Sequence, residues 1–407
     1  MKVTQALFLV GGKGTRLKSL TQNTPKPLLH ITPDLRFLDV LLENAARHGF
    51  TDIVLLAGHL GEQVIEAYHG KTIYGADVRV IKEPVPAGTV GALTYARDIL
   101  DPWFVMANGD SLFDVNLRDI AKQPSQDFTA RLALRKVEDA SRYGTVVLDG
   151  GWVSGFYEKS LTTVGPALIN GGIYLMSRDI LDMINGPCSI ESDIFPKLAA
   201  QQRLQGTQMN GYFLDIGLPD TFEQACIDLP KQRIRPAVFF DRDGVLNHDE
   251  GYTHKPADLK WMPGAKAAVR AVNDAGWLAI VVTNQSGIAR GYFSEAEMDA
   301  FHANMQDELA TQGSHIDCFY HCPFHKDGVV PQFTHPDHHD RKPNPGMIER
   351  ALQEWPIDVG KSFLVGDREH DVMAAQSARI AGYLYQGGSL LEIIKPRLNL
   401  APAPQRG

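Results

Sequence analysis

The sequence ALFLVGGKGTRL, residues 6–17, decides the fold of the first part of the chain. Its apolar half, residues 6–10, predicts a buried β-strand, and a glycine-rich loop, residues 11–14, follows at once. A continuous apolar run of this length is typical of a parallel strand with both faces covered. Because ligands bind at the carboxyl ends of parallel strands, we expect a binding site at this loop.

The same pattern recurs along the chain, with each apolar run followed by a loop bearing glycine or aspartate and then by a helix-like stretch. The strands predicted in this way are 6–10, 53–57, 104–107, 237–240, 278–282 and 363–365. The amphipathic helices predicted between them include 92–100, 265–275 and 295–310. The predicted fold class is therefore α/β, with parallel strands covered by helices on both faces.

A basic segment bracketed by prolines, residues 228–236, breaks this rhythm and predicts an interdomain linker. Each side of it is long enough to bury a core of its own. The expected organisation is a domain over 1–229, a linker over 230–236, a second domain over 237–390 and a flexible tail over 391–407.

Composition excludes several classes of protein. With 407 residues, 44% of them hydrophobic, and a net charge of −8, the chain is neither disordered nor a general nucleic-acid binder. Its 4 cysteines predict no disulfide framework, and no apolar run has the length of a membrane span. We expect a cytoplasmic protein with no nucleic-acid or membrane partner. The sequence leaves open whether the chain forms a homo-oligomer.

The glycine-rich loop is suited to phosphate binding. Closely spaced glycines let backbone N–H groups converge on phosphate oxygens, but the loop fits neither a P-loop nor a dinucleotide-binding fingerprint. Arg16 adds positive charge, and Lys26 is fixed between two prolines. Asp110 follows the strand 104–107, which is where an α/β sheet places a metal ligand.

Together with Glu158-Lys159, Asn170-Gly171-Gly172 and Asp215-Ile216-Gly217, these motifs resemble the sugar-1-phosphate nucleotidylyltransferase family over roughly residues 1–225. The resemblance implies a Rossmann-like nucleotidyltransferase fold that needs Mg²⁺. The residues implied to bind the nucleotide are Gly11, Gly12, Gly14, Thr15, Arg16, Glu83 and Gly88. Lys26 would contact phosphates, Asp110 and Asp215 would hold Mg²⁺, and Glu158, Lys159 and Asn170 would face the sugar phosphate.

Within that family, EPVPAGTVG (83–91) and NGDSLFDV (108–115) look most like the heptose-1-phosphate guanylyltransferases, which use GTP. Val90 replaces a glycine of their usual G-T-G-G. In the implied reaction, a sugar phosphate oxygen attacks the α-phosphorus and pyrophosphate leaves. The protein would position the phosphates and neutralise their charge, with Arg16 and Lys26 in the catalytic set.

The second half has its own phosphate-handling pattern. Asp241 and Asp243 follow the strand 237–240, and two carboxylates so placed can divide nucleophilic and acid/base tasks. Alone, this D-x-D-G motif also fits a turn or a calcium-like loop. Three further motifs follow later in the chain: Thr283-Asn284, Arg341-Lys342 and Gly366-Asp367.

This set resembles the haloacid dehalogenase superfamily of aspartyl phosphatases, again with a Rossmann-like fold. Asp241 would be the nucleophile and Asp243 the acid/base, while Asp371 would orient the site or cap a helix. The implied phosphoryl-binding residues are Thr283, Asn284, Arg341 and Lys342, and the implied Mg²⁺ ligands are Asp241, Asp243 (through its backbone carbonyl) and Asp367. FFDRDGVLN and TNQSGIARGYF look like heptose-1,7-bisphosphate phosphatases, over about residues 237–388; histidinol-phosphate phosphatases are close relatives.

The heptose phosphatases carry a small zinc loop before their R-K-P motif, and here that loop is altered. One cysteine remains, and the C-x-C half is missing. Two interpretations stay open: a rebuilt zinc site or a metal-free polar loop. The candidate zinc ligands are Cys322, His325, His335 and His338.

The two resemblances together imply one bifunctional enzyme of GDP-heptose biosynthesis for bacterial surface glycans such as lipopolysaccharide or an S-layer glycan. The phosphatase would remove the 7-phosphate, and the transferase would join heptose 1-phosphate to GMP. Other nucleotides, sugars or phosphomonoesters are an alternative. A further alternative is that one domain is a catalytically inactive binding module.

Overall fold

The structure, a computed structural model, describes residues 2–12, 14–140, 144–157 and 165–398. The chain forms two compact units that divide between Lys231 and Gln232. Helix α6, Pro219–Gln232, runs into the segment predicted as a linker. Residues 230–232 are helical because Ala225 and Leu229 bury one face of this helix in the first unit's core. Within the residues that the structure describes, none of the helices has both the length and the apolar character of a membrane span.

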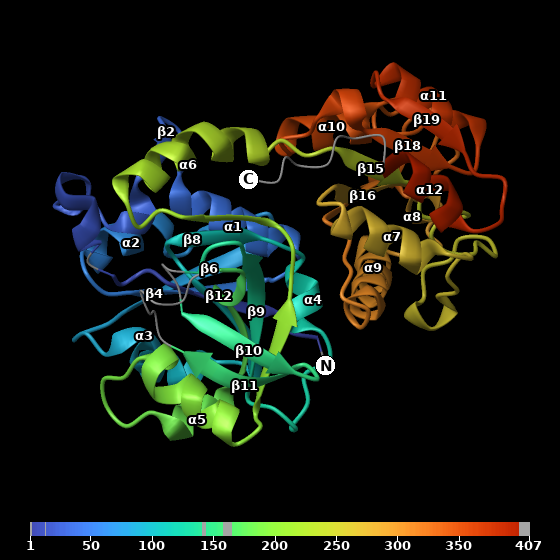
Figure 1. Cartoon of the computed structure of the whole chain (residues 1–407). Helices are drawn as coiled ribbons and strands as arrows, with labels where there is room; N and C mark the ends of the chain where they lie inside the picture. The colour runs from blue at the N-terminus through green and yellow to red at the C-terminus, as the bar shows by residue number, and fades with distance from the viewer. Residues whose placement is uncertain (1, 13, 141–143, 158–164, 399–407) are drawn as a thin grey trace. The chain divides into compact units, whose positions relative to one another are not determined.

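The first unit is built on a ten-stranded sheet in the order β10-β11-β13-β9-β12-β7-β1-β4-β6-β5. Strands β9, β10, β11 and β12 of this sheet are labelled in Figure 1. Its strands are β1 Gln5–Leu9, β4 Asp52–Ala57, β5 Thr72–Ile73, β6 Ala76–Lys82, β7 Trp103–Asn108, β9 Ala130–Val137, β10 Thr145–Asp149, β11 Trp152–Tyr157, β12 Ala167–Ser177 and β13 Leu204–Gln208. Two small pairs stand apart: β2 His30–Thr32 with β3 Leu35–Arg36, and β8 Ser111–Asp114 with β14 Tyr212–Asp215.

The three strands predicted in this unit are β1, β4 and β7, and β1 pairs in parallel with both of the others, as expected. The rest of the sheet is mixed, because β12 runs antiparallel to β7 and β9. The hairpin β10–β11 turns through Gly150 and Gly151, both with positive φ, which is the geometry of a tight antiparallel connection. The strands predicted from apolar runs are therefore parallel, and the antiparallel strands of this unit were not predicted.

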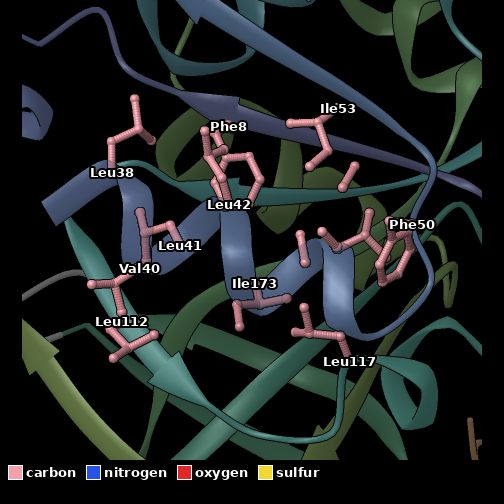
Figure 2. Close-up of a cluster of buried hydrophobic side chains, with 14 of the residues drawn as sticks. Phe8, Leu38, Val40, Leu41, Leu42, Phe50, Ile53, Leu112, Leu117 and Ile173 are labelled. Atoms are coloured by element: carbon pink, nitrogen blue, oxygen red, sulfur yellow. The ribbon is translucent and has the colours of Figure 1, made fainter. Parts of the chain in front are cut away.

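Helices cover this sheet and complete two apolar cores. The helices are α1 Phe37–Arg47, α2 Gly61–Tyr68, α3 Gly88–Gly91, α4 Leu117–Ala121, α5 Phe195–Ala200 and α6. There are also 3₁₀ segments at 15–21, 26–28, 92–99 and 178–183 and a π-helical turn at 190–194. The helix predicted over 92–100 is thus a 3₁₀ segment that follows α3. Figure 2 shows side chains of α1 in one cluster with side chains of the sheet: Leu38, Leu41 and Leu42 with Phe8, Ile53 and Ile173.

The second unit has a five-stranded parallel sheet in the order β17-β16-β15-β18-β19. The strands are β15 Ala237–Phe240, β16 Leu278–Asn284, β17 Cys318–Cys322, β18 Phe363–Gly366 and β19 Ala381–Leu384. The helices are α7 Ala265–Asp274, α8 Ser286–Ala289, α9 Glu295–Ala310, α10 Gly346–Glu354, α11 Glu369–Ser377 and α12 Leu390–Leu398, with 3₁₀ turns at 256–258, 331–333 and 359–361. The strands predicted here, β15, β16 and β18, are neighbours and parallel.

The segment predicted as a flexible tail from residue 391 begins instead with α12. Leu390, Ile394 and Leu398 recur on one face of this helix and are buried in the core of the second unit. Their spacing of four residues is that of an amphipathic helix. The proline and alanine content of the last residues hid this pattern, and residues 399–407 lie outside the described part.

Candidate active sites

In the first unit, the ends of four adjacent strands bring their loops together. Gly11 follows β1, Gly58 follows β4 and Glu83 follows β6. A Cβ on Gly11 would lie 2.6 Å from Glu83 Oε1 and 2.9 Å from the Gly58 nitrogen. Beyond β7, the Gly109 nitrogen donates to the Leu9 carbonyl at 3.0 Å. The loop needs glycine because neighbouring backbone approaches it closely.

Lys26, Asp110 and Asp215 meet beside these loops. Lys26 Nζ lies 2.8 Å from Asp110 Oδ2 and 3.7 Å from Asp215 Oδ1. The β8–β14 pairing places Asp215 opposite Ser111, next to Asp110 in the chain. Three residues that are separated by up to 189 positions in the sequence therefore form one charged cluster (215 minus 26).

The charge balance of this cluster suits a divalent cation. Burial raises the pKa of Asp215, and the neighbouring Asp110 carboxylate raises it further, while Lys26 opposes both effects. One ammonium group thus serves two carboxylates that repel each other. Oxygen ligands of this kind are the ones that Mg²⁺ prefers, so Asp110 and Asp215 fit the metal that the sequence predicts for them.

The Gly14 loop borders Lys26. Gly14 has φ +60°, and a Cβ there would lie 3.3 Å from Lys26 Cβ. Thr15 and Arg16 begin the next 3₁₀ segment and are exposed, as is Gly12 in the loop. Of the predicted sugar-phosphate residues, Glu158 and Lys159 lie outside the described residues.

Asn170 lies on β12. Its Nδ2 donates to the Tyr174 hydroxyl and to Glu191 Oε1, both at 2.8 Å. Its Oδ1 accepts from the Gly172 nitrogen at 3.0 Å. The pKa of Tyr174 is raised mainly by burial, and the charges of Glu191 and Asp110 add to this effect. Asn170 is therefore linked through Tyr174 to the surroundings of Asp110.

The loop over 83–91, which holds the predicted nucleotide-binding residues Glu83 and Gly88, is joined to the segment that carries Glu191. Gly88 has φ +80°, and a Cβ there would collide with the Cys188 carbonyl. The Cys188 nitrogen donates to the Ala87 carbonyl at 2.9 Å, and the Ile190 nitrogen donates to Thr89 Oγ1 at 2.9 Å. Gly88 is thus required by backbone packing.

In the second unit, Asp241 leaves the end of β15 and is buried. Lys342 Nζ lies 2.9 Å from Asp241 Oδ1 and 2.6 Å from Asp371 Oδ1, and it also donates to the Val282 carbonyl at 2.8 Å. Asn284 holds this lysine through two backbone bonds: Nδ2 donates to the Lys342 carbonyl, and Oδ1 accepts from the Lys342 nitrogen, both at 3.1 Å. The Asn284 side chain therefore fixes the backbone of Lys342.

Burial raises the pKa of Asp241 to about 7; the Lys342 charge opposes this shift and the Asp371 charge adds to it. Burial alone would lower the pKa of Lys342, but the two carboxylates outweigh it and hold that pKa above its ordinary value. The pKa of Asp367 is raised by burial and by Asp371. This site carries more negative charge than one lysine neutralises.

Asp241, Asp367 and Asp371 each offer an oxygen within 4.8 Å of the others. Oδ1 of Asp367 is buried and, among the described residues, receives no hydrogen bond. A Cβ on Gly244 would lie 2.5 Å from Asp367 Oδ2, so the loop is shaped around this carboxylate. The three residues fit a hard cation. Asp371 was predicted only to orient the site or cap a helix; it does cap α11, by accepting from the Arg368 nitrogen at 3.1 Å, and it also belongs to this group.

The Asp243 side chain lies outside that group, since its carboxylate is bound by other side chains. Arg242 Nε and Nη2 donate to Oδ1 at 3.0 Å and to Oδ2 at 2.9 Å. Gln285 Nε2 donates to Oδ2 at 2.8 Å. The sequence prediction missed both partners, although Arg242 stands between the two aspartates and Gln285 follows Thr283-Asn284 directly.

An open cavity with about 770 Å³ of empty space connects these groups. Its lining includes Asp241, Asp243, Thr283, Asn284, Gln285 and Arg341. Thr283 Oγ1 accepts from Gln285 Nε2 at 2.8 Å. The structure thus brings the predicted nucleophile, the predicted acid/base and three predicted phosphoryl-binding residues, Thr283, Asn284 and Arg341, to one cavity. The fourth, Lys342, contacts Asp241 instead of lining the cavity.

The structure does not support the zinc interpretation. Across the described residues, Cys322, His325, His335 and His338 do not meet as three ligand atoms within 4.8 Å. Instead Nδ1 of each histidine accepts from the backbone nitrogen two residues later, at 3.0–3.2 Å. The His338 ring also stacks on Phe324 at 3.7 Å. Hydrogen bonds and ring packing hold this loop.

Comparison with known proteins agrees with the division of the chain into two units. Residues 5–232 match the nucleotidyl transferase family, and residues 339–394 match the HAD-hydrolase-like family. A D-glycero-beta-D-manno-heptose-1,7-bisphosphate 7-phosphatase of Rhodopseudomonas palustris is 45% identical over 161 residues, which are 40% of this chain and 89% of that protein.

The first unit has its own relatives. The mannose-1-phosphate guanylyltransferase catalytic subunit beta of Dictyostelium discoideum is 37% identical over 228 residues, 54% of this chain and 62% of that protein. The crystal structure of HddC from Yersinia pseudotuberculosis is 29% identical, with a TM-score of 0.50, and is covered completely by 56% of this chain. The chain therefore belongs to the nucleotidyl transferase family, and its second unit belongs to the phosphatase family of the Rhodopseudomonas relative.

Proposed function

We propose that this chain catalyses two consecutive steps of GDP-heptose biosynthesis. The second unit removes the 7-phosphate from D-glycero-D-manno-heptose 1,7-bisphosphate. The first unit then transfers GMP from GTP to heptose 1-phosphate and releases pyrophosphate. The observation that carries this proposal is the presence, in one chain, of two separate carboxylate–lysine clusters, Lys26 with Asp110 and Asp215 and Lys342 with Asp241 and Asp371.

In the phosphatase, Asp241 attacks the phosphorus and the bond from phosphorus to the sugar oxygen breaks. Asp243 gives its proton to that leaving oxygen. Water then attacks the aspartyl-phosphate, its proton passes to Asp243, and inorganic phosphate leaves with Asp241 restored. Lys342, 2.9 Å from Asp241 Oδ1, orients the nucleophile and offsets the negative charge of the phosphoryl group.

In the transferase, the sugar phosphate oxygen attacks the α-phosphorus of GTP and the bond to the pyrophosphate oxygen breaks. A phosphate oxygen is already a nucleophile, so the chain's residues bind and orient the reactants. The Gly11–Gly14 loop and Arg16 grip the triphosphate, and Lys26 neutralises charge at the reacting phosphates. Asn170 binds the sugar phosphate.

We infer that both units take Mg²⁺, through Asp110 and Asp215 in one and through Asp241, Asp367 and the Asp243 carbonyl in the other, with Asp371 beside them. When bound, Mg²⁺ supplies charge neutralisation for phosphate oxygens.

We further propose a Rossmann-like architecture for both units, cytoplasmic action and a role in lipopolysaccharide or S-layer glycan synthesis. The names of the phosphatase and guanylyltransferase relatives support the choice of heptose and GTP.

The test is to incubate the purified chain with heptose 1,7-bisphosphate, Mg²⁺ and one nucleoside triphosphate at a time. Mass spectrometry is expected to find GDP-heptose with GTP. Product with UTP, CTP or ATP but not with GTP would contradict the guanylyl assignment. A parallel assay with histidinol phosphate and other phosphomonoesters separates the alternative phosphatase substrates, and both anomers of the bisphosphate should be offered.

A further inference from the structure

Arg242 is fully buried although it carries a permanent charge. It stands between the two aspartates of the phosphatase motif, and its fork of donors meets both oxygens of Asp243, at 3.0 and 2.9 Å. Replacing a buried ion pair by apolar side chains is often neutral for stability, so stability alone does not account for this arginine. A planar fork of this kind fixes the orientation of a carboxylate.

The guanidinium group is itself held by several elements. Nη2 also donates to the Thr253 carbonyl at 2.8 Å and to Gln285 Oε1 at 3.0 Å. Helix α9 supplies the Phe301 ring, 4.8 Å from the guanidinium carbon, and His302, whose Nε2 lies 3.2 Å from Nη1. Burial and the Arg242 charge hold the pKa of His302 well below its ordinary value, so this neutral ring can accept. The arginine is thereby locked in one position.

The two aspartates have separate supports. Asp243 receives two more hydrogen bonds, from Asn247 Nδ2 to Oδ1 at 3.0 Å and from Gln285 Nε2 to Oδ2 at 2.8 Å. Asp241 is held by Lys342 and by the backbone nitrogen of Arg242, at 2.8 Å. The Arg242 side chain therefore acts on Asp243, while the nucleophile keeps its own contacts.

We propose that Arg242 is a positioning residue for the phosphatase. It fixes the Asp243 carboxyl group where that group gives a proton to the leaving oxygen and later takes a proton from the attacking water. The inference rests on the proposed phosphatase function and identifies the residue that orients its acid/base, Asp243. It predicts a defect in proton transfer, with the attack by Asp241 left intact.

The leaving group distinguishes these two parts of the reaction. A sugar alkoxide needs a proton to leave, whereas p-nitrophenolate leaves without one. With p-nitrophenyl phosphate, a chain lacking Arg242 should complete the first half-reaction quickly. It should then stall as the aspartyl-phosphate, because the displaced Asp243 no longer takes the proton from water.

The experiment compares Arg242→Met and Arg242→Lys with the unmodified full-length chain in Mg²⁺. On p-nitrophenyl phosphate, Arg242→Met should release about one p-nitrophenolate per chain in a burst and then turn over about 10²-fold more slowly. On heptose 1,7-bisphosphate it should show no burst, a kcat lowered by about 10²- to 10³-fold and a KM within about threefold of the original. Arg242→Lys should recover part of the kcat, because it keeps the charge without the fork.

Arg270→Met is the matched control. Arg270 Nε also donates to an aspartate, Asp274, at 2.8 Å, but it lies on α7 outside the cavity lining. This variant should hydrolyse both p-nitrophenyl phosphate and heptose 1,7-bisphosphate at the rate of the unmodified chain.

Equal loss of the burst and of steady turnover in Arg242→Met or Arg242→Lys, with a folded chain by thermal melting, would overturn the inference, as would no loss at all. If Arg242→Met does not fold, the same criteria apply to Arg242→Lys. If the unmodified chain does not hydrolyse the bisphosphate, the substrate assignment fails, while the burst with p-nitrophenyl phosphate still decides the role of Arg242.

Discussion

At the scale of residues, each unit places one lysine between two carboxylates. Lys26 lies between Asp110 and Asp215, and Lys342 lies between Asp241 and Asp371. Both lysines are buried. A buried ammonium group that is shared in this way costs desolvation and is retained where it is needed to neutralise phosphate charge.

Removing Lys26 tests this argument in the first unit. Lys26→Met should lower kcat for pyrophosphate release by about 10²-fold or more, because two carboxylates and the triphosphate lose their shared cation. Pyrophosphate is measured with GTP and heptose 1-phosphate. Lys82→Met, which removes an exposed lysine paired with Glu62, is the control and should leave the rate unchanged. An unaffected Lys26→Met rate would exclude this role.

The thiol of Cys322 tests the metal-free interpretation of the histidine-rich loop. Burial raises its pKa to about 11, so the folded chain keeps the thiol neutral over the range where an ordinary thiol ionises. Alkylation of Cys322 should therefore be slow near pH 8 and should keep accelerating toward pH 11. Mass spectrometry after iodoacetamide treatment measures it, with the half-buried Cys226 as a faster reference. Faster alkylation of Cys322 after a zinc chelator would restore the zinc interpretation.

Single residues also show what the sequence could and could not predict. Lys26, Asp110 and Asp215 are recognisable because each stands in a short motif beside a strand or a proline, and the structure brings them together. Arg242 and Gln285 stand within recognised motifs, but their role comes from the direction of their side chains, which local sequence does not encode. The distance from Asp371 to Asp241 and Asp367 depends on how β15 and β18 pair.

At the scale of elements, the Gly88–Gly91 turn depends on its contact with the 186–190 segment. Gly88→Ala should raise the KM for GTP about tenfold or more, since a Cβ there meets the Cys188 carbonyl at a positive φ. Gly70→Ala isolates the backbone cost, about 1 kcal/mol, because Gly70 has φ +76° and open space around it. Steady-state kinetics and thermal melting compare the two. Equal effects on the KM for GTP would rule out the packing explanation.

Helix α12 provides a second prediction for an element. Ile394→Ala should destabilise the second unit by about 2–5 kcal/mol, because Ile394 is fully buried in its core. Lys395→Ala changes an exposed residue of the same helix and should have little effect. Urea unfolding followed through phosphatase activity measures both. If Ile394→Ala were as stable as the unmodified chain, the helix would not belong to the core.

Strands with a continuous apolar run were predictable from the sequence. Elements whose position depends on contacts with distant segments of the chain were not. The six predicted strands all form, and the neighbours of β1 and β15 are parallel as expected. The antiparallel part of the first sheet depends on the Gly150–Gly151 turn and on distant pairing with β12. The burial of α12 depends on contact with α7, which the composition of the last residues does not reveal.

At the scale of the whole molecule, the two reaction centres lie in separate compact units, each with its own sheet and core. We therefore expect each unit to carry the residues of its own step. Asp241→Asn should abolish phosphate release from the bisphosphate while leaving pyrophosphate release from GTP and heptose 1-phosphate. Asp110→Asn should have the opposite effect. Inorganic phosphate and pyrophosphate are assayed separately; a folded single variant that lost both activities would refute independent sites.

The most direct measurement mixes these two variants. Each alone, given heptose 1,7-bisphosphate, GTP and Mg²⁺, should make no GDP-heptose detectable by mass spectrometry. Mixed in equal amounts they should make it, because Asp110→Asn supplies heptose 1-phosphate to Asp241→Asn. No GDP-heptose from the mixture, with both variants folded and the unmodified chain active, would contradict the claim that the chain holds two complete and independent active sites.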